Sequence, residues 1–247
     1  MQEKIIKERH ESIKNMLENS GSLCICDCGK PKMIDISQYR IDAISKHQTE
    51  NTKILYDRYS IFDILNSFNR PLNVMEIGVH AGDFAELMNE NLTIKKMYLI
   101  DPFTNEDQMS STPRFNSNTN LDFVEKRFSN KNIVEILQGH SSHLLPNFIQ
   151  LKEQEKIDFI YIDSNHLFIN TYNEILYSSQ ILSDDGIIGL DDCTNYSDDP
   201  RQLNEVLNSV TSFLANNKNW QVAYYSFNDA GWPNIYLSKI KQNHHQV

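Results

Sequence analysis

The stretch Asn73-Val-Met-Glu-Ile-Gly-Val-His-Ala-Gly82 decides which fold the sequence predicts. It starts as a short apolar run with one carboxylate, Glu76, and continues into Gly78 and Gly82. A helical pattern begins directly afterwards, so the order predicts a buried strand, a glycine turn and a helix. Because glycine has no side chain, such a turn lets a nucleoside ligand lie against bare backbone.

Short apolar runs and helical patterns alternate from residue 72 onward. The apolar runs are Val74–Val79, Lys96–Ile100, Ile133–Leu137, Ile157–Ile162 and Ile187–Leu190. The helical patterns between them are Phe84–Leu92, Leu121–Phe128, Ser142–Phe148 and Phe168–Leu182. Strands that alternate with helices pair in parallel through right-handed crossovers, so we predict a doubly wound α/β sheet.

The two ends of the chain extend this pattern. After a predicted helix at about 201–217, Trp220–Phe227 and Asn234–Ile240 read as strands that pair antiparallel, giving seven strands in total. Helices are expected over 1–20 and over about 51–68, where apolar residues fall on one helical face. We therefore divide the chain into a helical N-terminal extension, 1–70, and a main domain, 71–247.

Composition excludes several classes of function. The net charge is −10, from 23 Lys and Arg against 33 Asp and Glu, which argues against a nucleic-acid binder. No apolar run reaches the roughly 20 residues that a membrane helix needs. The N-terminus lacks the apolar region of a signal peptide, so we expect a cytoplasmic protein without a membrane partner.

Three cysteines alternate near the N-terminus, at Cys24, Cys26 and Cys28. They could be thiolate ligands of a metal, but zinc sites usually have wider gaps between paired cysteines. The alternative is free thiols in a reducing compartment. The sequence leaves their role open.

Acidic residues stand at the ends of most predicted strands, where open parallel sheets bind their ligands. Asp101 follows Gly82 by about 20 residues, a spacing that suits hydrogen bonds to ribose hydroxyls. The dinucleotide fingerprint Gly-x-Gly-x-x-Gly is absent, and Glu76 and Asp83 would repel a pyrophosphate. These residues favour a cationic ligand that carries a ribose. The strand-end residues are Glu76, Asp101, His140, Ser141, Asp163, Asp191 and Asp192.

The ordered set of Glu76-Ile-Gly-Val-His-Ala-Gly82, Asp101 and Phe159-Ile-Tyr-Ile-Asp163, with the final helix and hairpin, resembles the class I S-adenosylmethionine-dependent methyltransferases. The resemblance covers about 72–240 and implies their Rossmann-like fold. It further implies that Glu76, Gly78 and Gly82 line the methionine and ribose side of S-adenosylmethionine, that Asp101 holds the ribose hydroxyls, and that His140 and Ser141 flank the adenine.

A narrower likeness concerns Asp163-Ser-Asn-His166 and the pair Asp191-Asp192, which resemble the metal-dependent O-methyltransferases of the macrocin and catechol types. The resemblance implies Mg²⁺ held by Asp163, Asp191 and Asp192, oxygen ligands that this ion prefers. The catechol-type enzymes place a lysine base where this chain has His166, and histidine can take a proton at neutral pH. His166 could instead cap the helix that follows, and Asp191-Asp192 could be a solvated turn.

The resulting prediction is an enzyme that methylates a hydroxyl of a small molecule such as a sugar, with Asp163 and His166 as catalytic residues. The N-terminal extension is expected to cover the acceptor pocket. A metal-independent methyltransferase, a nicotinamide-dependent oxidoreductase and a non-catalytic nucleoside-binding protein remain alternatives. The sequence does not settle whether the chain forms a homo-oligomer.

Overall fold

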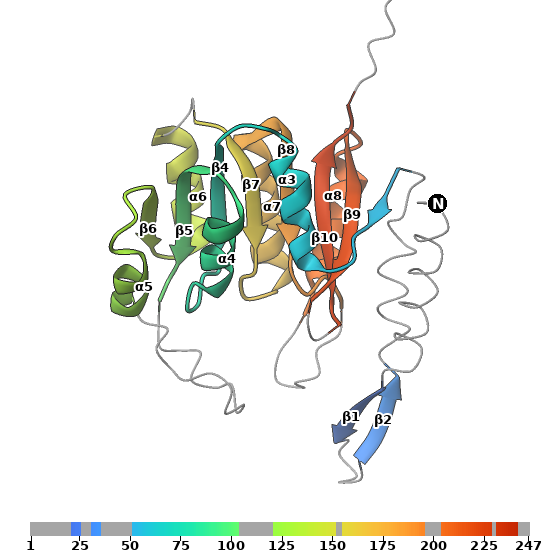
Figure 1. The fold of residues 1–247 in the computed structure, drawn as a ribbon. Coiled ribbons are helices and arrows are strands. Elements are labelled where there is room, and N and C mark those ends of the chain that lie inside the picture. The colour runs from blue at the N-terminus through green and yellow to red at the C-terminus, as the bar shows by residue number, and fades with distance from the viewer. Residues whose placement is uncertain are drawn as a thin grey trace, which may run out of the picture. The chain divides into compact units, whose positions relative to one another are not determined.

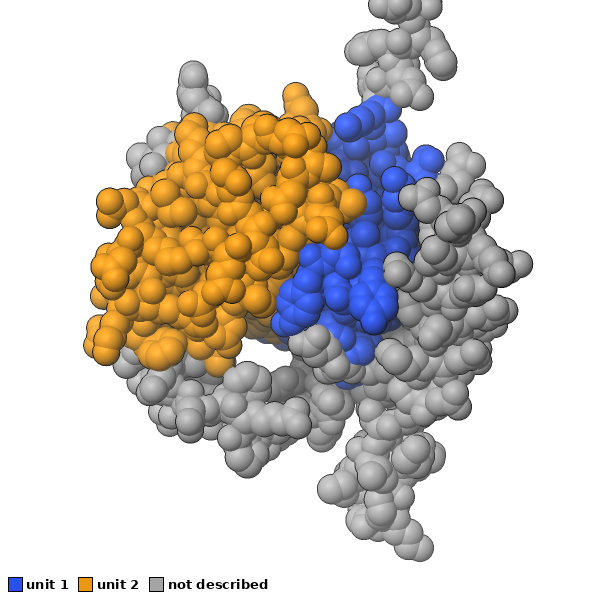
Figure 2. Space-filling view, viewed as in Figure 1, with its two compact units in different colours: residues 1–61, 166–172, 190–247 blue, residues 62–165, 173–189 orange. Residues whose placement is uncertain are grey.

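The computed structural model of the chain describes residues 21–25, 31–35, 51–103, 121–151, 155–195, 204–228 and 231–241. The expected helix over 1–20, together with Cys26 and Cys28, lies outside the described residues. Two compact units make up the chain, drawn in blue and orange in Figure 2. Unit 1 comprises 1–61, 166–172 and 190–247, and unit 2 comprises 62–165 and 173–189. The predicted division at residue 70 stays a prediction.

Unit 2 holds the parallel strands, hydrogen-bonded in the order β8-β7-β4-β5-β6 (Figure 1). Their bounds are β4 Leu72–Ile77, β5 Ile94–Asp101, β6 Val134–Gln138, β7 Ile157–Ile162 and β8 Leu182–Leu190, the last residue of which belongs to unit 1. The pairs β4–β5, β4–β7 and β5–β6 are parallel. Every residue of β7 is buried, as expected for a parallel strand covered on both faces.

Helix α3 precedes β4, and the other helices of unit 2 connect these strands. The helices are α3 Ile61–Asn66, whose first residue belongs to unit 1, α4 Asp83–Asn91, α5 Leu121–Phe128, α6 Ser141–Leu151, and α7 Phe168–Ile181, whose first turn belongs to unit 1. Phe84 at the start of α4 stacks on Tyr161 of β7, with ring centroids 4.0 Å apart. Such a pair contributes about 0.5–1.5 kcal/mol beyond the area it buries. The stack therefore fixes the start of α4, and with it the glycine turn, against the sheet.

Unit 1 holds the remaining strands of the sheet, in the order β3-β9-β10. Its elements are β3 Lys53–Ile54, the 3-10 helix η1 Arg58–Ser60, α8 Val206–Asn216, β9 Trp220–Phe227 and β10 Pro233–Lys239, with a separate antiparallel pair β1 Gly21–Ile25 and β2 Pro31–Asp35. β9 and β10 pair antiparallel, and β3 pairs parallel to β9. The backbone amide of Asn228 donates to the backbone carbonyl of Trp232 at 2.9 Å and closes the turn of the hairpin.

The predicted fold class is confirmed: a mixed α/β sheet, mostly parallel, with an antiparallel C-terminal hairpin. Among the described residues the sheet has eight strands rather than seven, because β3 was not expected. The helix predicted over 51–68 is wrong in its first part, where the chain forms β3 and η1 before α3 begins. Within the described ranges, none of the helices combines the length and the apolar character that crossing a bilayer requires.

Candidate functional site

The glycine turn links β4 to α4 with backbone conformations that favour glycine. Gly78 has a φ of +87° and Gly82 a φ of +80°, both in the left-handed region. His80 between them adopts a φ of +51°, a conformation uncommon for a residue with a side chain. Backbone strain of this kind concentrates at functional sites. The predicted order of strand, glycine turn and helix is confirmed.

Gly78 is packed against backbone of its own unit. A Cβ atom at this position would lie 1.9 Å from the carbonyl oxygen of Asp163 and 2.9 Å from the Cα of Ser164. The amide of Asp163 also donates to the carbonyl of Ile77 at 2.8 Å. The absence of a side chain at Gly78 therefore brings the end of β7 next to the turn, a role that the sequence pattern did not reveal.

Asp101, at the end of β5, holds the turn through its carboxylate. Oδ2 accepts the amides of Val79 at 2.7 Å and His80 at 3.1 Å, and Oδ1 accepts the amide of Phe103 at 2.6 Å. A carboxylate offers about four acceptor positions, so these bonds leave capacity for one more donor. Asp101 thus shapes the loop that was predicted to seat the cofactor, and capacity remains for the predicted ribose contact.

The acids near the glycine turn differ in burial and in their interaction partners. Glu76 is buried inside β4, in register with Leu99 on one side and Tyr161 on the other. Asp83 and Glu86 in the first turn of α4 both pair with Arg127 of α5, which also donates to the carbonyl of Ala81 at 2.7 Å. The single positive charge of Arg127 offsets part of the negative charge at the start of α4, which weakens the electrostatic argument against a pyrophosphate there. The turn still lacks the central glycine of the dinucleotide fingerprint.

Of the residues predicted beside the adenine, His140 lies between β6 and α6, and Ser141 begins α6. His140 is exposed, with its ring edge-on to that of His143. The Ser141 hydroxyl donates to Oε1 of Glu174 at 2.5 Å, and Oε2 of the same carboxylate accepts the Ser164 hydroxyl at 2.7 Å. Sequence reasoning missed Glu174. The sequence offered one indication of its role, since Glu174 is the single charged residue of helix α7.

His166 belongs to unit 1 and precedes α7. Its φ is +58°, again in the left-handed region, and its carbonyl accepts the amide of Glu205 at 2.9 Å. The Glu205 carboxylate in turn accepts the amide of Phe168 at 3.0 Å, so it caps the first turn of α7. These bonds hold the backbone of His166 in a left-handed conformation at the start of α7.

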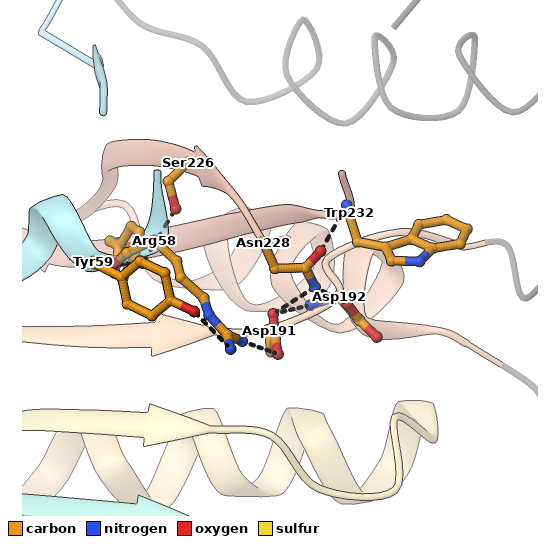
Figure 3. Close-up of polar contacts among 8 residues, drawn as sticks. Arg58, Tyr59, Asp191, Asp192, Ser226, Asn228 and Trp232 are labelled. Atoms are coloured by element: carbon orange, nitrogen blue, oxygen red, sulfur yellow. Dashed lines mark hydrogen bonds and ion pairs between the residues drawn. The ribbon is translucent and has the colours of Figure 1, made fainter. Parts of the chain in front are cut away.

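Asp191 and Asp192 follow β8 and share one partner, Asn228 (Figure 3). The Asn228 amide group donates to Oδ1 of Asp192 at 2.7 Å and to Oδ1 of Asp191 at 3.3 Å. Its own oxygen accepts the amide of Trp232 at 3.0 Å, which fixes the direction of the side chain. Asp192 has a φ of +45°. The hairpin loop after β9 therefore positions both carboxylates.

Arg58 of η1 supplies a positive charge to this acidic pair. Its Nη1 lies 3.5 Å from Oδ2 of Asp191, and its guanidinium lies over the ring of Tyr59 at 5.2 Å from the ring centroid. The buried hydroxyl of Tyr236 donates to the Arg58 carbonyl at 3.2 Å. Sequence reasoning did not identify Arg58, because it lies more than a hundred residues before its partner.

The residues at this pair do not fit a magnesium site as they stand. A divalent cation on the Asp191 carboxylate would lie beside a guanidinium of like charge, which repels it. Across the ranges that the structure describes, no group of three or more His, Cys, Asp or Glu side chains could hold a metal ion. Burial and the Asp192 charge raise the pKa of the Cys193 thiol well above its usual value, so this cysteine stays protonated. The predicted ligand Asp163 belongs to unit 2, whereas Asp191 and Asp192 belong to unit 1.

Comparison with known proteins agrees with this architecture. Residues 75–193 match a family model described as a methyltransferase domain. An O-methyltransferase from Bacillus cereus in complex with SAH has a TM-score of 0.53 at 15% identity, with 81% of this chain and 87% of that chain covered. The O-methyltransferase TomG from Streptomyces achromogenes, in complex with SAM, has a TM-score of 0.55 at 12% identity over 83% and 89%. No curated protein matches the chain in sequence.

Proposed function

We propose that this chain, whose residues 75–193 match a family model described as a methyltransferase domain, is a class I S-adenosylmethionine-dependent methyltransferase that methylates a hydroxyl group of a small molecule. The observation that carries the proposal is the turn after β4, within the matched residues. Two glycines with positive φ flank Val79 and His80, whose backbone amides donate to the Asp101 carboxylate. The names of the O-methyltransferases with the same fold favour oxygen as the accepting atom.

The cofactor, when bound, supplies an electrophilic methyl group on a positively charged sulfur. In the proposed arrangement Glu76, Gly78 and Gly82 line its methionine and ribose side, Asp101 accepts a ribose hydroxyl, and His140 lies by the adenine. Ser141 reaches the adenine through its backbone, because its hydroxyl is engaged by Glu174. The acidic character of these strand ends suits a cationic ligand.

His166 is the proposed base, and Asp163 lies on the acceptor side. The imidazole of His166 would accept the proton of the acceptor hydroxyl, a role that contributes about 10²–10⁴-fold in rate. Asp163 is held beside the glycine turn by its backbone contacts with Gly78 and Ile77. Positioning of the two reactants accounts for most of the remaining acceleration. The proposed acceptor is a small polyhydroxylated metabolite such as a sugar.

Calorimetric titration with S-adenosylhomocysteine tests the cofactor assignment. We expect a Kd on the order of 1–100 µM, in the range usual for enzymes and their substrates. NAD should give no heat, since the dinucleotide fingerprint is absent. Binding of neither ligand at about 1 mM would contradict the proposed function. Transfer of a labelled methyl group to a panel of sugars and related metabolites then identifies the acceptor class.

Magnesium at Asp163, Asp191 and Asp192 stays a prediction, and the ion pair of Asp191 with Arg58 argues against it. The proposed transfer therefore includes no step at a metal. We expect methyl transfer in excess chelator to stay within about twofold of the untreated rate, because the guanidinium already neutralises Asp191. A loss of 100-fold or more that Mg²⁺ restores, and that Asp191→Asn reproduces, would contradict this expectation and support the magnesium prediction.

A further inference from the structure

The buried carboxylate of Glu174 connects two loops of unit 2. Glu174 lies in the middle of α7 with 2% of its surface exposed. One oxygen accepts the hydroxyl of Ser141, which begins α6, and the other accepts the hydroxyl of Ser164, which follows β7. The two distances, 2.5 Å and 2.7 Å, are short, as is usual when a hydroxyl donates to a charged oxygen.

A carboxylate at this position carries an energetic cost. Moving a charged group out of water costs several kcal/mol unless hydrogen bonds replace its hydration. The rest of this face of α7 is occupied by uncharged residues such as Ile175 and Ser178, both fully buried. An apolar side chain would fill the same space without that cost. The bonds to Ser141 and Ser164 therefore account for an acid here better than packing does.

The two hydroxyls belong to segments that follow β6 and β7, two strands that the sheet separates by β4 and β5. Gly139–Ser141 follows β6, on the side proposed for the adenine. Asp163–Ser164 follows β7, on the side proposed for the acceptor. The second segment also contacts Gly78, where a Cβ would overlap the Asp163 carbonyl. The Glu174 carboxylate thus binds both the segment proposed to lie by the adenine and the segment that contacts Gly78.

We propose that Glu174 is a positioning residue that couples the adenine-side segment, Gly139–Ser141, to the acceptor-side segment, Asp163–Ser164. The inference rests on the function proposed above and assigns no contact between Glu174 and a ligand. Loss of the bond on one segment releases the shared carboxylate and loosens the other. Removal of the Ser164 hydroxyl therefore weakens cofactor binding through Glu174.

The test is a comparison of S-adenosylhomocysteine affinities by calorimetry, with Ser164→Ala as the decisive variant. We expect its Kd to rise about five- to tenfold, within the range seen for coupled residues in contact. Ser178→Ala is the matched control, since Ser178 is a buried serine one turn along the same helix and its hydroxyl has no hydrogen-bond partner. Its Kd should stay within twofold of that of the wild type.

A double-mutant cycle distinguishes coupling between Ser164 and Glu174 from a general loss of stability. Glu174→Ala and Glu174→Ala with Ser164→Ala should bind S-adenosylhomocysteine equally, because the serine acts only through the carboxylate. Glu174→Gln keeps one acceptor oxygen and should recover part of the loss. Wild-type affinity in Ser164→Ala, or losses that simply add in the double variant, would overturn the inference. Absence of binding by the wild-type protein would instead overturn the proposed function and this inference with it.

Discussion

Replacement of Gly78 by alanine is expected to lower the free energy of unfolding by about 4 kcal/mol or more and to abolish S-adenosylhomocysteine binding. The added Cβ would lie 1.9 Å from the Asp163 carbonyl oxygen and 2.5 Å from its carbonyl carbon. Both are backbone atoms, which cannot rotate away as a side chain can. The φ of +87° adds about 1–2 kcal/mol for a residue with a Cβ. Urea denaturation followed by circular dichroism measures the change.

Gly82→Ala provides the comparison, since its backbone is strained in the same way. Its φ is +80°, but the nearest neighbour of an added Cβ is a ring atom of Phe128 at 3.0 Å. This ring can shift, so we expect about 1–2 kcal/mol, the cost of the left-handed conformation alone. Equal losses in the two variants would show that the overlap with Asp163 does not occur. The difference between them isolates the packing of the turn against the end of β7.

The parallel strands could be predicted because each contains a run of apolar residues, such as Phe159–Ile162 in β7. β7 was predicted at its observed bounds, and so was β9, where aromatic and β-branched residues favour a strand. The amphipathic helix α5 was also predicted at its observed bounds. In each case one stretch of sequence contains the whole signal, because burial on both faces or on one helical face determines the pattern.

The segment from 51 to 60 could not be predicted because its structure depends on a strand far along the chain. Leu55, Tyr59, Phe62 and Leu65 have helical spacing, yet Lys53 and Ile54 pair with Tyr224 and Tyr225 of β9. The Leu55 amide also donates to the carbonyl of Tyr225 at 2.7 Å. Such pairing overrides local periodicity, and nothing in residues 51–60 alone indicates it.

The places of the acids at the strand ends could be predicted, but their interaction partners could not. Asp101 ends β5 and Asp191 directly follows β8, as the apolar runs before them indicate. What each acid contacts depends on residues from other elements: backbone amides for Asp101, Arg58 and Asn228 for Asp191, and Arg127 for Asp83. The sequence of a motif is the same whether its carboxylate binds a metal, a guanidinium or an amide. Only the fold distinguishes these uses.

Asp101→Ala is expected to lower the free energy of unfolding by about 3 kcal/mol and to weaken S-adenosylhomocysteine binding more than tenfold. The substitution leaves the amides of Val79, His80 and Phe103 without their acceptor, at a cost of roughly 1–3 kcal/mol for each amide that water does not reach. Asp122→Ala, which removes an exposed acid of α5, should change stability by less than about 0.5 kcal/mol. Chemical denaturation and calorimetry measure both effects.

Two roles of Asp101 can be separated, since bracing the turn and holding the ribose depend on different donors. If Asp101 accepts a ribose hydroxyl, wild-type protein binds S-adenosylhomocysteine more tightly than its 2′,3′-dideoxy analogue, and Asp101→Ala removes most of that preference. If the carboxylate only braces the turn, Asp101→Ala weakens both ligands by the same factor and leaves the preference intact. The ratio of the two affinities is independent of how far the loop has loosened, because both ligands meet the same loop. An unchanged ratio would make the predicted ribose contact wrong while leaving Asp101 as the residue that shapes the cofactor turn.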